Sequence, residues 1–163
     1  MLKNISNEVK ILVGVSAVTL ALVVGAAFMF GHSSSSSAKN AKPVTNTEAL
    51  ASKDSHIIKS NDSKVTLVEF GDFQCPACGA IHPTVAQVLK EYKGKINFVF
   101  RNFPLPMHKN AQEAAEAAEA AGAQGKFFEM YDKLYINQGK WGETDKAMEY
   151  FVQYAKEIKL DVD

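Results

Sequence analysis

The chain has very little cysteine and no excess charge of either sign, and each shortage excludes a class of protein. Among 163 residues there are two cysteines, three positions apart, so they cannot form the long-range disulfide cross-links that stabilise small secreted domains. Eighteen basic residues balance eighteen acidic ones, giving a formal net charge of zero. Without a basic surplus the chain lacks the electrostatic signature of nucleic-acid binding, so we expect no nucleic acid among its partners.

Charged residues are also missing from one long stretch near the N-terminus. Residues 11–30 are uncharged, and about twenty such residues form a helix long enough to cross roughly 30 Å of hydrocarbon. Two lysines precede this stretch, whereas the next ones follow a neutral run of serines, so residues 1–10 are expected in the cytoplasm and the rest outside the cell membrane. Bulky residues at its exit favour a single-pass, uncleaved anchor over a cleaved signal peptide.

The segment after the predicted anchor has the composition of a linker. Residues 31–55 contain five consecutive serines at 33–37 and continue without apolar periodicity, which predicts a flexible tether. The remaining residues, 56–163, have room for one modest domain.

The first half of that domain shows a strand, a helix and a second strand in close succession. Val65–Phe70 is a short apolar run that predicts a buried strand. Apolar residues recur at spacings of three and four over Pro76–Tyr92, which predicts a helix that ends at Gly94. Ile96–Phe103 is the next predicted strand. This order predicts a βαβ unit with parallel strands.

The second half is predicted to be helical throughout. Three helices are expected over Lys109–Ala123, Lys126–Ile136 and Thr144–Leu160. The aromatic side chains of the second helix have the spacing that burial requires, so we interpret them, like Trp141, as core residues rather than as a cofactor site. The row of glutamates on the first helix is interpreted as a solvated surface.

Both cysteines lie at the predicted junction between strand and helix, in the run Cys75-Pro76-Ala77-Cys78. Pro76 suits the first position of a helix, where its missing N–H costs nothing. The free N–H groups and the positive end of the helix dipole then favour a thiolate on Cys75, which we predict to be the nucleophile. Cys78, one turn further on, is expected to face the interior and to act as the resolving thiol.

A carboxylate lies on the preceding strand. Glu69 is expected to point into the interior of the sheet, where a carboxylate is costly, and we predict that it exchanges protons with Cys78. The alternative is a partly hydrated acid at the end of the strand.

Two histidines raise the alternative of a zinc site together with the cysteines. His82 follows Cys78 by four residues on the predicted helix, and His108 could approach from a loop. Against a metal, Cys78 is expected to be buried, Pro83 follows His82 directly, and nothing holds His108 nearby. We therefore expect no metal, and we interpret His82 as a surface or groove residue.

These residues together resemble one known family. The run Val-Glu-Phe-Gly-Asp-Phe-Gln-Cys-Pro-Ala-Cys at 68–78 resembles the active-site signature of the DsbA-like branch of the thioredoxin superfamily. Glu69 stands where that superfamily places its buried acid, and Pro83 stands where it places a helix-kinking proline. Residues 101–105 and 124–130 resemble the family's strand exit and its inserted helical subdomain. The resemblance covers residues 57–163.

The resemblance implies an α/β fold, a thioredoxin-like βαβ unit with an inserted helical subdomain. Pro76, Ala77 and Pro83 would support the active site in such a fold. The family also has a cis-proline loop, two further strands and a last helix after the insertion, whereas the last proline here is Pro106. We therefore expect the C-terminal half of the sheet to be missing, which would leave an unpaired strand edge.

The resemblance also implies a thiol-disulfide oxidoreductase. The oxidised Cys75–Cys78 pair would accept electrons from cysteine pairs of exported proteins, and a quinone-linked membrane protein would reoxidise it, without a bound cofactor. Because Pro76-Ala77 lacks the histidine of the strongest oxidants of the family, a less stabilised thiolate is expected. The alternatives are a reductase or isomerase of the same fold, and a non-catalytic metal-binding module that uses both thiols.

Overall fold

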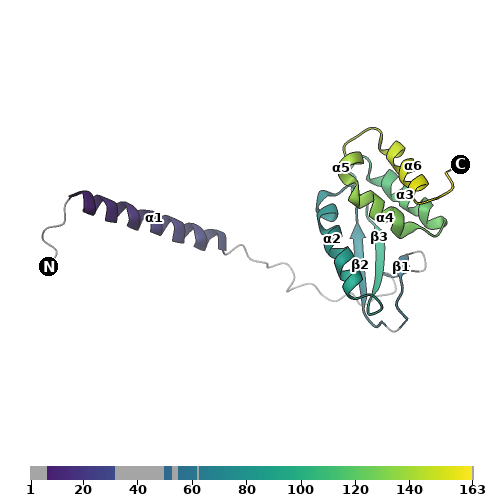
Figure 1. The fold of residues 1–163 in the computed structure, drawn as a ribbon, viewed down its shortest axis with the longest axis horizontal. Coiled ribbons are helices and arrows are strands. Elements are labelled where there is room, and N and C mark those ends of the chain that lie inside the picture. Colours follow the sequence, from purple (N-terminus) through teal and green to yellow (C-terminus); the bar gives the residue numbers. More distant parts are fainter. Residues whose placement is uncertain (1–6, 32–49, 53–54, 62, 163) are drawn as a thin grey trace. The chain divides into compact units, whose positions relative to one another are not determined.

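The computed structural model describes residues 7–31, 50–52, 55–61 and 63–162. The chain forms two compact units, Met1–Thr45 and Asn46–Asp163. Among the described residues, the first unit contains helix α1 and the second contains the remaining helices and strands (Figure 1).

Helix α1 (Asn7–Gly31) covers the uncharged stretch near the N-terminus. The prediction of a helix there is confirmed. Within the part of the chain that the structure describes, no helix combines the length and the apolar character needed to cross a membrane. The membrane span predicted for residues 11–30 is thus not found, and the linker predicted for 31–55 lies largely outside the described residues.

The second unit contains a small mixed sheet of the strands β1 (His56–Ile58), β2 (Thr66–Gly71) and β3 (Asn97–Asn102). The strand order is β1-β3-β2. β2 and β3 are parallel, as the βαβ pattern predicted, with Glu69 opposite Phe100. β1 pairs antiparallel with β3 and was not predicted, because three residues are too few to show a periodic pattern.

The prediction that the first strand of the βαβ unit is buried is wrong. Leu67 is 37% exposed and Phe70 is 53% exposed, whereas Val68 and Glu69 are half-buried. The reason is position: within the described sheet β2 lies at the edge and pairs with β3 alone. This arrangement agrees with the expected unpaired strand edge.

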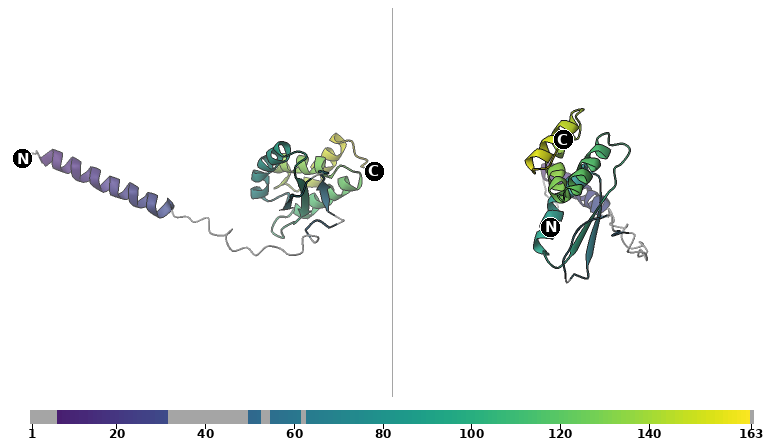
Figure 2. Two further views of the ribbon diagram at one scale, coloured as in Figure 1. Left: turned by 90° about the horizontal axis from the view of Figure 1, so that it is seen from below. Right: turned by 90° about the vertical axis from the view of Figure 1, so that its right-hand side faces the viewer.

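The second unit also holds five helices within the described residues: α2 (Pro76–Glu91), α3 (Ala111–Ala123), α4 (Phe127–Ile136), α5 (Gln138–Trp141) and α6 (Ala147–Glu157). Four were predicted to within a few residues at each end. Gly94, expected to end the first of them, has a φ of +80°, which suits glycine. α5 was missed because it is a single turn. Helices α5 and α6 lie toward the end of the sheet to which β2 and β3 run, whereas α4 packs on β3, with the ring of Phe128 5.8 Å from that of Phe98 (Figures 1 and 2).

Helix α4 lies at the centre of this unit, in contact with α2, α3 and α6. Its aromatic side chains are buried, as their spacing predicted: the Tyr131 ring packs edge-on against Phe100 at 4.9 Å between centroids and against Tyr135 at 5.0 Å. Trp141 is fully buried, which confirms its assignment to the core, and its indole N–H donates to the carbonyl of Leu134 at 2.9 Å. The core therefore joins the inserted helices to the sheet.

Candidate active site

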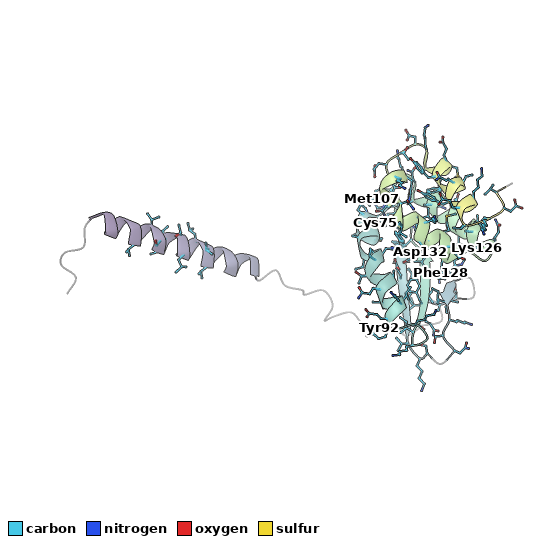
Figure 3. The ribbon with its side chains drawn as sticks, viewed as in Figure 1. Cys75, Tyr92, Met107, Lys126, Phe128 and Asp132 are labelled. Atoms are coloured by element: carbon cyan, nitrogen blue, oxygen red, sulfur yellow. The ribbon has the colours of Figure 1, made fainter. Side chains whose placement is uncertain are left out.

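Cys75 occupies the N-cap position of α2, and Pro76 is the first residue of that helix, as predicted. The Cys75 backbone is extended, with φ −66° and ψ 121°, and its carbonyl accepts the first helical hydrogen bond from the N–H of Gly79 at 3.0 Å. The first turn of α2 contains no acidic residue that would oppose a thiolate. In Figure 3 Cys75 and Tyr92 mark the two ends of this helix.

Cys78 lies one turn further along α2 and packs against the hydrophobic core, but like Cys75 it is only partly buried, so the expected full burial is not observed. Burial raises the pKa of its thiol above the ordinary value, and the neighbouring Cys75 and Glu69 raise it further, whereas a hydrogen bond with the backbone of Asp72 lowers it. Cys78 therefore retains its proton at neutral pH. The two cysteines have different surroundings, which a division of labour between nucleophile and resolving thiol requires.

Glu69 extends from β2 and is half-buried, which lies between the interior position predicted for it and the partly hydrated alternative. Its Oε2 accepts a hydrogen bond from the Tyr131 hydroxyl at 2.9 Å, while its Oε1 has no partner among the described residues. Burial raises the pKa of Glu69, and the Tyr131 hydrogen bond and the charge of His82 act in the opposite direction. Glu69 also acts electrostatically on Cys78, so the two groups share one environment.

His82 was interpreted as a surface or groove residue, and that interpretation is wrong. Its side chain is buried, with its ring 5.2 Å from the rings of both Tyr131 and Tyr135. The Nε2 atom lies 3.0 Å from Oδ1 of Asp132. The physical reason is that α4 covers this face of α2, which the spacing of residues within α2 alone cannot show.

His108, the other histidine of the zinc alternative, contacts a carboxylate instead. Its Nδ1 lies 2.6 Å from Oδ2 of Asp72, a buried residue that also accepts hydrogen bonds from the N–H groups of Gln74 and Leu105 at 2.7 and 2.9 Å. Asp72 therefore ties the loop before Cys75 to the loop after β3. No group of three or more potential ligands for a metal occurs among the described residues.

Gln138 was not predicted to belong to the site. From α5 its Nε2 donates to the carbonyls of Phe73 and Cys75 at 2.7 and 2.9 Å. A Cβ at Gly79 would lie 2.5 Å from Oε1 of Gln138, so the glutamine also explains why a glycine follows the cysteine pair. A lone glutamine 63 positions after Cys75 carries no sequence signal of this contact.

A buried amide network holds the residue before Cys75. The side chain of Gln74 donates to the carbonyl of Gly142 at 2.5 Å and accepts from the N–H of Asn110 at 2.6 Å. The side chain of Asn110 in turn donates to the carbonyls of Trp141, Gly142 and Thr144. The active-site loop is thus fixed to the helical insertion and not only to β2 and α2.

The residues predicted to support the site lie on α2. Pro76 and Ala77 are exposed beside the cysteines, and Pro83 is exposed inside the helix. Their supporting roles stay predictions. No cis peptide bond occurs among the described residues.

The sequence is similar to that of a known family and of several characterised or named proteins. The family described as Thioredoxin matches residues 51–162. The Na(+)/H(+) antiporter NhaA 1 of Salinispora arenicola is 43% identical over 109 residues, which are 66% of this chain and 16% of that protein. The probable disulfide bond formation protein D of Bacillus anthracis is 34% identical over 130 residues, which are 76% of this chain and 60% of that protein.

Solved structures show the same fold. A thioredoxin-like oxidoreductase from Silicibacter pomeroyi has a TM-score of 0.58 and 27% identity, covering 72% of this chain and 64% of that one. The thiol-disulfide exchange protein alpha-DsbA2 from Wolbachia pipientis has a TM-score of 0.62 and 24% identity, covering 72% and 60%. The chain belongs to the thioredoxin family, and its fold is that of the DsbA-like thiol-disulfide oxidoreductases.

Proposed function

We propose that this chain is an extracytoplasmic thiol-disulfide oxidoreductase that introduces disulfides into exported proteins through Cys75 and Cys78. The observation that carries the proposal is the asymmetry of the pair: Cys75 caps α2, and Cys78 packs against the core with a raised pKa. The Bacillus anthracis relative is named as a probable disulfide bond formation protein, which supports the direction of the reaction.

The reaction begins with the oxidised pair. A substrate thiolate attacks the sulfur of Cys75, the Cys75–Cys78 bond breaks, and a mixed disulfide joins the substrate to Cys75. Cys78 leaves and takes up a proton. A second substrate thiolate then attacks the substrate sulfur of the mixed disulfide, so Cys75 leaves and the substrate disulfide forms. Two electrons pass from the substrate dithiol to the pair, which ends as a dithiol.

Glu69 is the group suited to the proton transfer. Because burial raises its pKa, its protonated form is favoured and can donate to the leaving Cys78 thiolate, and in the reverse step its carboxylate accepts the proton when the Cys78 thiol attacks a mixed disulfide. Cys78 needs this assistance because its own pKa is raised, so its thiolate is costly in the absence of a proton donor.

Reoxidation completes the cycle. We propose a quinone-linked membrane protein as the electron acceptor, in a compartment where disulfides persist. The uncharged run 11–30 and the positive charges before it support an anchor and an outward domain. Extraction of membranes at alkaline pH and protease treatment of intact cells test this location, and a chain recovered in the soluble cytoplasmic fraction would refute it.

A redox titration of the 163-residue chain tests the direction. The fraction of Cys75–Cys78 disulfide is followed by mass after alkylation in glutathione buffers, with circular dichroism to confirm folding. We expect a potential toward the oxidising value of DsbA, about −120 mV, whereas a value near that of thioredoxin, about −270 mV, would reassign the chain as a reductase.

Alkylation of the two thiols tests the chemistry itself. We expect Cys75 to react alone near neutral pH, Cys75→Ser to abolish turnover, and Cys78→Ser to accumulate mixed disulfides. Two equally reactive thiols that a divalent metal protects would refute the enzyme and favour a metal-binding module.

A further inference from the structure

Two loops meet at the end of the sheet away from the cysteines. One, residues 59–65, joins β1 to β2, and the other, residues 92–96, joins α2 to β3. The Ser60 hydroxyl donates to the carbonyl of Gly94, and the Ser63 hydroxyl donates to that of Lys95 at 2.7 Å. The N–H of Asn97 donates to the carbonyl of Val65 at 2.9 Å. These contacts fix the two loops to one another.

The joined loops and the last turn of α2 carry five exposed lysines, which we call the lysine pole: Lys59, Lys64, Lys90, Lys93 and Lys95. None of the five forms an ion pair with another described residue. Segments 58–65 and 89–97 contain two acidic residues, Glu91 and Asp62, the second of which lies outside the described residues. Five lysines against two acids give these segments a formal net charge of +3, in a chain whose net charge is zero.

The same end of the unit exposes apolar side chains among the lysines. Tyr92 is 49% exposed, Ile58 is 42% exposed and Val65 is 60% exposed. An open pocket of about 440 Å³ lies here, and both kinds of side chain line it: Ile58, Leu89 and Ile96 together with Lys59, Lys90 and Lys93. The surface is therefore amphipathic, with positive charge and apolar area side by side.

An anionic phospholipid membrane has the chemistry that matches this surface. Its phosphate groups attract lysines, and its headgroup region favours tyrosine, which has an apolar ring and a polar hydroxyl. Free phosphate or a purely acidic peptide would use the lysines, but neither would cover Ile58, Val65 and the ring of Tyr92. The combination therefore favours lipid over the other anions.

We propose that the lysine pole docks the second unit onto the surface of an anionic membrane, with Tyr92 and Ile58 among the headgroups. This goes beyond the proposed function, because neither the cysteine chemistry nor the predicted anchor requires it. Helix α2 has 16 residues and is therefore about 24 Å long, with Cys75 and Tyr92 at its two ends (Figure 3). Docking by the lysine pole keeps Cys75 away from the lipid and open to exported substrates.

Lysine labelling of the full chain tests this docking surface. The protein is mixed with vesicles of phosphatidylcholine alone, or of phosphatidylcholine with about one third phosphatidylglycerol. Brief acetylation followed by mass spectrometry then gives the labelling rate of each lysine. The uncharged residues 11–30 can enter either kind of vesicle, so the comparison isolates the effect of lipid charge.

The expected result is a footprint on one end of the unit. All lysines of the lysine pole should be labelled several-fold more slowly with anionic vesicles than with neutral ones. High salt should restore their labelling, because it screens exposed charges. The exposed Lys140, Lys146 and Lys156, on or beside α5 and α6, should be labelled equally with both kinds of vesicle.

Two triple variants of equal net charge provide the matched comparison. One carries Lys59→Gln, Lys90→Gln and Lys93→Gln, and the control carries Lys140→Gln, Lys146→Gln and Lys156→Gln. A basic residue near an anionic surface strengthens binding about fivefold, so the first variant should dock about a hundredfold more weakly. The two lysines that remain in its lysine pole should lose their protection, whereas the control should keep it. Tyr92→Ser should weaken docking at unchanged charge, and circular dichroism confirms that each variant is folded.

The other outcomes would refute the docking surface. Equal protection in the two triple variants would show that the lysine pole has no special role. Protection of Lys3 and Lys10 alone would show that the chain contacts the membrane only through the predicted anchor. If polyglutamate protects the lysine pole as well as anionic vesicles do, and Tyr92→Ser has no effect, the surface belongs to an acidic protein partner instead. Oxidation of Cys75 and Cys78 by glutathione, measured in parallel, bears on the proposed function alone, so the two failures are distinguishable.

Discussion

Gln138→Ala should loosen the segment that carries the nucleophile. The wild-type side chain reaches from α5 to the carbonyls of Phe73 and Cys75, one on each side of Gln74. The Cys75 carbonyl keeps a second donor in the variant, the N–H of Gly79. The Phe73 carbonyl loses the side-chain donor that the structure gives it, so the variant removes two contacts and weakens the link between α5 and the loop.

The size of the effect follows from the two hydrogen bonds. Each is at normal length and half-buried, and a hydrogen bond of this kind contributes about 0.5–1.5 kcal/mol to stability. We therefore expect a loss of about 2 kcal/mol in the free energy of unfolding. With a urea m-value of about 2 kcal/mol/M, the midpoint should fall by about 1 M. The m-value itself should not change, because the surface exposed on unfolding is nearly the same.

The assay is urea denaturation followed by circular dichroism, with Gln153→Ala as the control. Gln153 also donates from its side chain to another residue, but its partner is the exposed Glu157 one turn along the same helix. Such pairs contribute about 0.2–0.5 kcal/mol, so this control should shift the midpoint little. The reasoning is refuted if the two variants have the same midpoint, because Gln138 would then be no more important than a surface glutamine.

Three other changes test the surroundings of the cysteines. Burial holds the pKa of Glu69 above its ordinary value of 4.5, so the native state binds more protons than the unfolded chain and stability falls as the pH rises from there through the native pKa. Glu69→Gln should reduce the loss of stability between pH 4 and pH 8 in urea denaturation, and an equal loss in variant and wild type would contradict this. Gly71→Ala should lower the free energy of unfolding by about 1–3 kcal/mol, because a Cβ would collide with aromatic side chains of β3 and α4. Gly139→Ala is the control, because a Cβ there would meet no atom within 4 Å, and it should not lower the free energy of unfolding. Equal urea midpoints for the two alanine variants would refute this reasoning. Asp72→Ala should lower the free energy of unfolding by about 3–5 kcal/mol, because it leaves its partner His108 and two backbone N–H donors unpaired. A loss below 1 kcal/mol would show that the two loops stay in place without this carboxylate.

The elements of the second unit could be predicted because most of them have a local cause. The helix α2 combines a proline at its first position, an apolar repeat and a glycine after its end, and the aromatic spacing of α4 indicates one buried face. The position of Cys75 at the cap follows from the same local signals. β1 and α5 were missed because three or four residues give no period, and the edge position of β2 was missed because pairing partners are not a local property.

The candidate site was predicted only in part, for a similar reason. The two cysteines and Glu69 lie within ten residues of one another, so their proximity can be inferred from a strand that leads into a helix. Tyr131 and Gln138 reach the same place from more than fifty positions away. Their contacts depend on how α4 and α5 pack, which no spacing within the sequence reveals.

This division has a consequence for how the redox pair is controlled. Strand β2 and helix α2 supply the sulfurs and the acid, but two contacts that hold them come from the helical insertion: Tyr131 of α4 donates to Glu69, and Gln138 of α5 donates to the Cys75 carbonyl. The same insertion fills the core through residues such as Tyr131, so its packing and the chemistry of the site are coupled. Substitutions at its buried tyrosines should change both together.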